Sequence, residues 1–213
     1  MAAIQQKTVG ILIFPEVEVL DFCGPFEVFS VTRLNEAKRR EQPSPFRVVL
    51  IADTAEPVSA AGGMRVLPDC TTIACPSLDI LLVPGGWGTR DQMNVTRIID
   101  WIRQRAKKVE LVTSVCTGSL LLGQAGLLDG HRATTHWDAL ATLRERFPKV
   151  TVVNDQHVVE EGNILTSAGI SAGIDLALRV VARCFGEPVA RNTARHMEYP
   201  YPESNARRVQ VSA

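Results

Sequence analysis

A cysteine at the end of an apolar segment is the first residue whose surroundings point to chemistry. Cys116 lies in residues 111–119 (LVTSVCTGS), and an apolar stretch continues after it. This order predicts a strand, a sharp turn and a helix, and the strained central residue of such a turn needs small neighbours such as Gly118 and Ser119. The helix N-terminus would then favour a thiolate, and its free N–H groups would bind an oxyanion. We therefore predict that Cys116 is an exposed nucleophile rather than a small buried core cysteine.

The carboxyl of Asp21 is the second candidate group, in residues 19–26 (VLDFCGPF). It follows an apolar segment and precedes a predicted helix, where a carboxylate most often serves only as a helix cap. Its neighbours Val19, Leu20 and Phe22 are apolar, and an apolar environment raises the pKa of a carboxyl group. Next to a thiol, such a carboxyl would hold a proton for donation, so we expect a general acid and base here.

Five further residues are candidates for binding substrate, each with a plainer alternative. Thr117 would donate a hydroxyl hydrogen bond, or it would cap the helix that follows. Gly85 and Gly86 follow a buried segment, and they would offer bare N–H groups to developing negative charge or form only a tight turn. Trp87 is a candidate for the apolar wall of a pocket. His136, in residues 134–137 (TTHW), would reach the same pocket or be a structural histidine.

Short apolar segments alternate with amphipathic ones along the chain, which predicts the elements that position these groups. Strands are expected at 8–14, 47–52, 78–83, 110–114, 132–135, 150–153, 157–161 and 164–167, with a hairpin excursion at 56–68. Helices are expected at 25–39, 95–107, 117–125, 137–147, 174–185 and 188–197.

This alternation predicts an α/β fold with a mostly parallel sheet covered on both faces, as one domain over residues 1–213. Ligands of such sheets bind at the carboxyl ends of the strands. Asp21, Gly85 and Cys116 each follow a predicted strand, so we expect them to share one crevice.

Composition excludes several other classes of protein. Of 213 residues, 46% are hydrophobic and 22% charged, which is typical of a globular chain. Lys+Arg and Asp+Glu are both 23, and a net charge of zero gives no electrostatic case for binding nucleic acid or acidic lipid. We expect no membrane span, because no apolar run approaches ~18 residues. We also expect no secretory signal, because the first ten residues (MAAIQQKTVG) lack a charged segment followed by an apolar one. The five irregularly spaced cysteines favour reduced thiols, a cytoplasmic location and no metal site.

Several sequence blocks, in this order, resemble the ThiJ/PfpI superfamily, the class I glutamine-amidotransferase-like group. They span about residues 8–200 and lie at 14–29 (FPEVEVLDFCGPFEVF), 83–88 (VPGGWG), 113–119 (TSVCTGS), 132–137 (RATTHW) and 166–175 (TSAGISAGID). The resemblance implies a flavodoxin-like three-layer α/β/α sandwich. The blocks are most similar to the isonitrile hydratase branch, which adds water to an isonitrile to give an N-substituted formamide without a cofactor, usually as a homodimer.

The same resemblance implies roles for three residues and leaves rivals. The family's nucleophile falls on Cys116, its catalytic aspartate on Asp21 and the adjacent threonine on Thr117. The peptidase branch has histidine directly after the nucleophile, and the glyoxalase-like branch often has glutamate at the position of Asp21, so both fit less well. Related regulators carry a helix-turn-helix domain downstream, for which we expect no room here. Another cysteine enzyme of the family, such as a glyoxalase or small amidase, and a thiol or ligand sensor remain alternatives.

Overall fold

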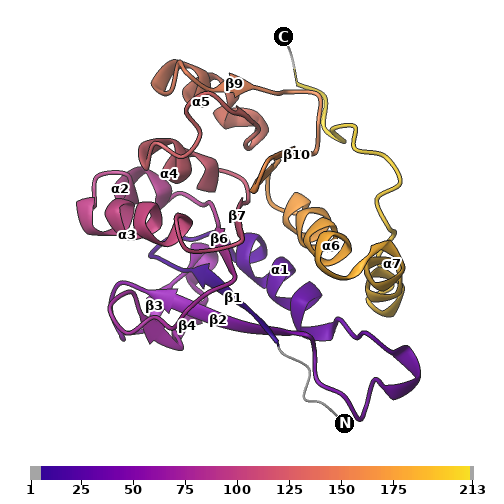
Figure 1. Cartoon of the computed structure of the whole chain (residues 1–213). Coiled ribbons are helices and arrows are strands. Elements are labelled where there is room, and N and C mark those ends of the chain that lie inside the picture. Colours follow the sequence, from indigo (N-terminus) through magenta and orange to yellow (C-terminus); the bar gives the residue numbers. More distant parts are fainter. Residues whose placement is uncertain (1–5, 212–213) are drawn as a thin grey trace.

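A seven-stranded sheet forms the centre of the computed structural model, which describes residues 6–211 (Figure 1). The strand order is β10-β11-β7-β6-β1-β2-β5, and every neighbouring pair is parallel except the β10–β11 hairpin. The strands are β1 (Lys7–Leu12), β2 (Phe46–Ala52), β5 (Cys70–Thr71), β6 (Ile80–Val83), β7 (Leu111–Ser114), β10 (Val158–Glu161) and β11 (Ile164–Ser167). The predicted mostly parallel α/β fold is thus confirmed.

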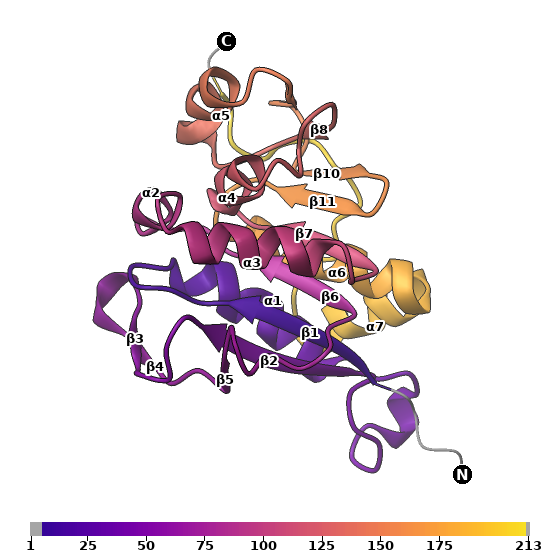
Figure 2. The same cartoon turned by 60° about the vertical axis from the view of Figure 1, so that its left-hand side comes forward.

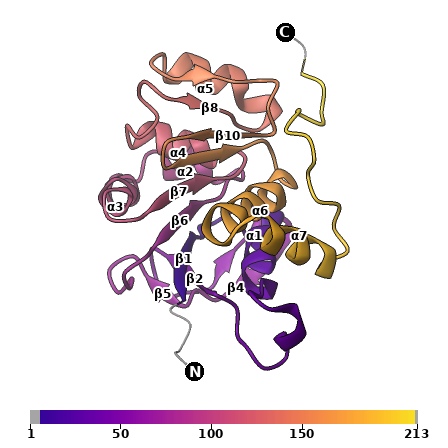
Figure 3. The ribbon, with the colours of Figure 1, turned by 45° about the vertical axis from the view of Figure 1, so that its right-hand side comes forward.

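Helices cover both faces of this sheet (Figures 1 and 3). On one face lie α1 (Val19–Val31), α6 (Ala172–Phe185) and α7 (Glu187–His196), and on the other α2 (Thr89–Gln92), α3 (Thr96–Ala106) and α4 (Gly118–Gln124). Within residues 6–211 no helix combines the length and the apolar character needed to cross a membrane.

Smaller elements lie outside the main layers. Helix α5 (Leu140–Arg146) lies beyond the β10 edge with the parallel pair β8 (Arg132–Ala133) and β9 (Thr151–Val152) (Figure 2). The predicted excursion after β2 is an antiparallel pair, β3 (Val58–Ser59) and β4 (Arg65–Val66). Single 3₁₀ turns occur at Glu36–Lys38, Ala61–Gly63 and Trp137–Ala139.

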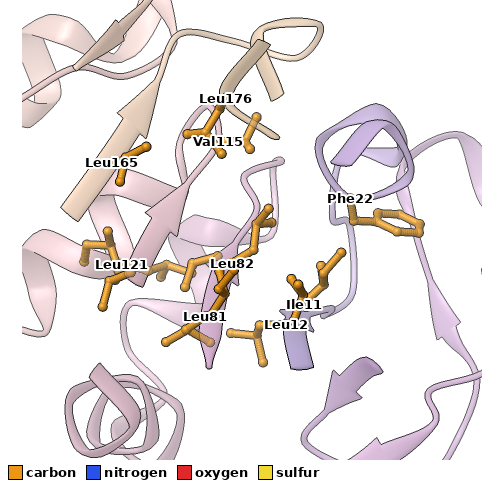
Figure 4. Packing of buried hydrophobic residues seen from close by; sticks show 14 of the residues in the cluster. Ile11, Leu12, Phe22, Leu81, Leu82, Val115, Leu121, Leu165 and Leu176 are labelled. Carbon is orange, nitrogen blue, oxygen red and sulfur yellow. The ribbon is translucent and has the colours of Figure 1, made fainter. Parts of the chain in front are cut away.

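The inner strands are buried along most of their length because helices pack on both sides. Leu81 and Leu82 of β6 lie between the side chains of β1 and Leu121 of α4 (Figure 4), and all three leucines are fully buried. Burying a leucine side chain stabilises the fold by about 1.5–3 kcal/mol. These strands therefore form a rigid base for the loops at their carboxyl ends.

The helix predicted at residues 25–39 has different bounds, and the difference concerns the site. Helix α1 begins before Pro25, which lies inside it. Proline has no N–H, so the carbonyl of Asp21 receives no helical hydrogen bond from it. The helix ends where the Arg33 guanidinium donates to the carbonyls of Ser30 and Thr32. Asp21 consequently lies in the first turn of α1 rather than before it.

Candidate active site

Three loops that carry the predicted residues meet at one edge of the sheet. They follow β1, β6 and β7, which are adjacent and parallel. Backbone contacts join the first two loops: the Glu18 N–H donates to the Gly85 carbonyl at 3.0 Å, and Val17 forms a bridge with Gly86. The structure thus brings Asp21, Gly85 and Cys116 together.

Cys116 forms a strained elbow between β7 and α4. Its φ is 56°, a left-handed conformation that non-glycine residues rarely adopt. Its N–H donates to the Ala168 carbonyl at 3.1 Å, and its carbonyl accepts the Thr135 hydroxyl at 3.0 Å. A Cβ on Gly118 would lie 2.1 Å from the Val83 carbonyl oxygen, so the small neighbour expected there is required.

The thiol of Cys116 differs from the sequence-based expectation in two respects. It is 5% exposed, and burial is the main cause that raises its pKa to about 12. The negative charge of Asp21 raises the pKa further, while the N–H groups of Thr117 and Ile170 lower it only in part. The expectation of an exposed thiolate is therefore wrong: desolvation outweighs the short helix α4, and the resting thiol keeps its proton.

The Asp21 carboxyl is fully buried, and burial raises its pKa to about 8. Its Oδ2 accepts the Gly85 N–H at 2.8 Å, which lowers the pKa in part, and the Cys116 thiol adds a weak hydrogen bond. Its Oδ1 is buried without a conventional hydrogen-bond partner among residues 6–211. The hydrogen bond that Asp21 accepts thus comes from the loop after β6 and not from the first turn of α1, whose N-cap residue is Glu18. Asp21 is thus not a helix cap, and at neutral pH it holds a proton.

The loop after β6 is tied to the elbow through Thr117. Its hydroxyl accepts the Gly86 N–H at 3.0 Å and the Thr89 hydroxyl at 3.2 Å. The N–H groups of Gly85 and Gly86 are therefore both engaged with side chains, and the expectation that they are bare is wrong. The N–H groups that lower the pKa of the Cys116 thiol are instead those of Thr117 and Ile170.

A pocket of about 130 Å³ lies next to the elbow, and Cys116 forms part of its lining. Its lining contains five of the predicted residues (Gly86, Trp87, Cys116, Thr117 and His136) together with Glu18, Arg90, Asp138, Ala139 and Ile170. Trp87 is 66% exposed at the pocket, and the Arg90 guanidinium stacks 4.7 Å from its ring centroid. The pocket therefore combines an apolar interior with charged groups at its rim.

His136 lines the pocket but is oriented by its own turn. Its Nδ1 accepts the Asp138 N–H at 3.3 Å, and burial lowers its pKa, so the ring is neutral. The ring fills the space beside Gly169, where a Cβ would lie 2.1 Å from Cδ2. No hydrogen bond joins His136 to Cys116 among the described residues, so His136 does not activate the thiol as a base would.

Sequence reasoning missed four of the polar contributors. Ile170, with φ 53°, acts through its backbone N–H, which its side chain does not reveal. The other three are charged residues close in sequence to predicted ones: Glu18, Arg90 and Asp138. In the sequence, their place in the pocket is indicated only by their positions, shortly after the end of a strand or next to His136.

Comparisons with known proteins agree with this architecture. The model of the DJ-1/PfpI family matches residues 7–183. The isonitrile hydratase of Pseudomonas putida is 39% identical over 194 residues, which cover 90% of this chain and 78% of that protein. The transcriptional regulator GbdR of Pseudomonas aeruginosa is 29% identical over 86% of this chain, which spans about half (48%) of the regulator. A crystal structure of a ThiJ/PfpI family protein from Pseudomonas syringae superposes with a TM-score of 0.80 at 30% identity, covering 94% of this chain and 78% of that one.

Proposed function

This chain belongs to the DJ-1/PfpI family, and we propose that it adds water to isonitriles to give N-substituted formamides, with Cys116 as nucleophile and Asp21 as proton carrier. One observation carries the proposal: a fully buried carboxyl with a pKa of about 8 lies against the thiol of a strained elbow. The isonitrile hydratase relative supports the choice of substrate class. No cofactor is needed for the reaction.

The neutral thiol and carboxyl suit the first step. Sγ of Cys116 bonds to the isonitrile carbon while Asp21 gives its proton to that carbon and takes the proton of the thiol. The product is a covalent thioimidate, R–N=CH–S–Cys. Asp21 is again protonated, so one carboxyl has served as acid and base.

Water completes the reaction on the same carbon. Asp21 protonates the imine nitrogen and accepts a proton from the attacking water, which gives a tetrahedral adduct. The C–S bond then breaks, the hydroxyl proton returns to sulfur through Asp21, and the N-substituted formamide leaves. Thr117 positions the loop of Gly85 and Gly86 against the elbow, and Trp87 and His136 supply walls of the pocket.

Kinetics on cyclohexyl isocyanide test the assignment. Cys116→Ala should abolish turnover, because the covalent route is lost. Asp21→Asn keeps the shape but cannot carry the proton, and loss of acid–base catalysis costs on the order of 10²–10⁴ in kcat/KM. The double variant should be no slower than Cys116→Ala, since the two groups act as a unit. Near wild-type turnover by Asp21→Asn would refute the proton-carrier role.

Two rivals are separated in the same assay. A glyoxalase or small amidase of the family would turn over methylglyoxal or an amide but not the isonitrile. A thiol or ligand sensor would turn over none of them, and a sensor of peroxide would show reversible oxidation of Cys116. Turnover of the isonitrile alone supports the hydratase.

We also propose a homodimer in the cytoplasm. The family resemblance supports the dimer, and helix α1 exposes the apolar side chains of Leu20 and Phe26. The irregularly spaced cysteines support a reducing compartment. Light scattering at micromolar concentration should give twice the 23.3 kDa mass of one chain, and a monomer mass would overturn the dimer.

A further inference from the structure

A second cavity, of about 220 Å³, adjoins the catalytic pocket and shares His136 and Ile170 with it. The C-terminal segment closes its outer side; this segment, yellow in Figures 1 and 3, runs from α7 back towards β10. Its lining includes Trp137, His157, Ser171, Arg207, Arg208 and Val209. Two guanidinium groups line the cavity, and no carboxylate of residues 6–211 does.

Among residues 6–211, no carboxylate contacts the guanidinium of Arg207. Its Nη2 donates to the Thr134 hydroxyl at 2.6 Å and the Thr135 carbonyl at 3.0 Å, which are both neutral. Its Nε is buried and has no hydrogen-bond partner within residues 6–211. Arg208, in contrast, forms an ion pair with Asp175 at 2.6 Å. The cation at Arg207 is thus the one in this lining that a negative ligand would neutralise.

A buried histidine adds an unused polar atom to the same lining. His157 is 6% exposed, and its Nε2 lies 3.2 Å from Oδ2 of Asp175. Both ring nitrogens are buried without a hydrogen bond to the described part of the chain, but only Nε2 has a carboxylate beside it. The ring therefore offers one nitrogen to a polar ligand, in addition to the guanidinium of Arg207.

The cavity also lies at a helix end and has an apolar rim. Ser171 is the N-cap of α6, a helix of 14 residues whose dipole favours negative charge at this end. At the rim, Trp137 is 50% exposed and Val209 is 55% exposed. A ligand that suits all of these features carries one negative charge and an apolar body.

We propose that this cavity binds a small organic carboxylate, with its charged end against Arg207 and His157 and its apolar body between Trp137 and Val209. The site is distinct from the Cys116 pocket and does not depend on the reaction proposed above. It is placed to communicate with that pocket, because the Ala168–Ile170 loop that forms its wall also binds the N–H of Cys116 and contacts its sulfur.

Calorimetric titration with benzoate, and with benzamide as its uncharged analogue, tests the proposal. Benzoate should bind at least tenfold more tightly than benzamide, because only benzoate pairs with the guanidinium. Arg207→Gln should weaken benzoate binding at least tenfold. Arg191→Gln removes one charge from a surface arginine paired with Glu187 and Glu203, and should leave benzoate binding unchanged. Equal affinity for benzoate and benzamide would overturn the proposal.

A second pair of variants locates the bound benzoate and does not disturb Arg207. Val209→Asp places a negative charge at the rim on an exposed residue and should weaken benzoate binding at least tenfold, whereas Val209→Asn should have little effect. Trp87→Phe alters the Cys116 pocket and should leave the affinity unchanged. A large loss with Trp87→Phe and none with Val209→Asp would place benzoate in the catalytic pocket and refute the second site.

Discussion

Replacing Asp21 by asparagine should stabilise the folded protein, and increasingly so as the pH rises. The carboxyl is fully buried, and burial raises its pKa from 3.8 to about 8. Between these pH values the folded state holds a proton that the unfolded state has released. The free energy of unfolding of the native protein therefore falls as pH rises through this window. Asparagine has no such proton and does not impose this loss.

The size of the effect follows from the limits of that window. Both pH 5 and pH 7 lie inside it, so Asp21 changes the free energy of unfolding by about 1.4 kcal/mol per pH unit. Over the two units the native protein should lose about 2.7 kcal/mol relative to Asp21→Asn. The side-chain oxygen of the introduced asparagine can still accept the Gly85 N–H that Oδ2 accepts at 2.8 Å, so the loop contact is kept.

Urea denaturation at pH 5, 6 and 7 measures this difference directly. The other carboxyls titrate equally in the native protein and in Asp21→Asn. The way in which the difference between their free energies of unfolding changes with pH therefore reports on Asp21 alone. Asp91→Asn is the matched control, because it makes the same chemical change at an exposed carboxyl of α2 and leaves the buried Asp21 in place. A difference between native protein and Asp21→Asn that stays constant from pH 5 to pH 7 would refute the raised pKa, and with it the proton-carrier argument.

Three further predictions concern the elbow and its pH dependence. Gly118→Ala should lower the free energy of unfolding by more than the ~1–3 kcal/mol typical of overpacking, because its Cβ would meet the backbone oxygen of Val83. Gly10→Ala should lower it by less, because its Cβ would meet only the ends of the Leu78 and Ile51 side chains. Urea denaturation compares the two variants. At pH 9 iodoacetamide should alkylate Cys116 faster in Asp21→Asn than in the native protein, because the ionised carboxylate raises the thiol pKa; peptide mapping that shows equal rates would contradict this. The kcat/KM for an isonitrile should fall above about pH 8 as Asp21 loses its proton, and a profile flat to pH 10 would count against the acid role.

The central strands could be predicted from sequence because burial between two helical layers requires continuous Val, Ile and Leu segments. Strand β6 (ILLV) is such a segment, whereas β7 (LVTS) has only two residues of this kind and is nevertheless fully buried. Strand β5 and helix α2 were not predicted, because both are short and are stabilised by other parts of the chain. The strand at Cys70 pairs only with the end of β2, and the helix that begins at Thr89 follows a tight loop. Pro25 was misleading, because proline usually begins a helix and here lies inside one.

The convergence of Cys116 and Asp21 could also be predicted, since it follows from parallel strands and their carboxyl ends. The protonation state of Cys116 could not be predicted in the same way. Its burial depends on Ala168 and Ile170, which contact it from far along the chain. Local sequence shows the helix end that favours a thiolate but not the long-range burial that opposes it.

The two raised pKa values suit an uncharged substrate. A thiolate paired with an imidazolium would place two charges in the pocket before substrate arrives, and entry of an apolar molecule would desolvate both. Here the thiol and the carboxyl are both neutral near pH 7, so the largely buried site has no ion pair to desolvate. In the proposed reaction the isonitrile carbon takes up a proton and a sulfur in one step, and a neutral donor next to a neutral thiol would supply both without building a separate charge. The same burial of Asp21 that lowers the stability of the folded protein at neutral pH thus keeps on the carboxyl the proton that the proposed reaction transfers to the substrate.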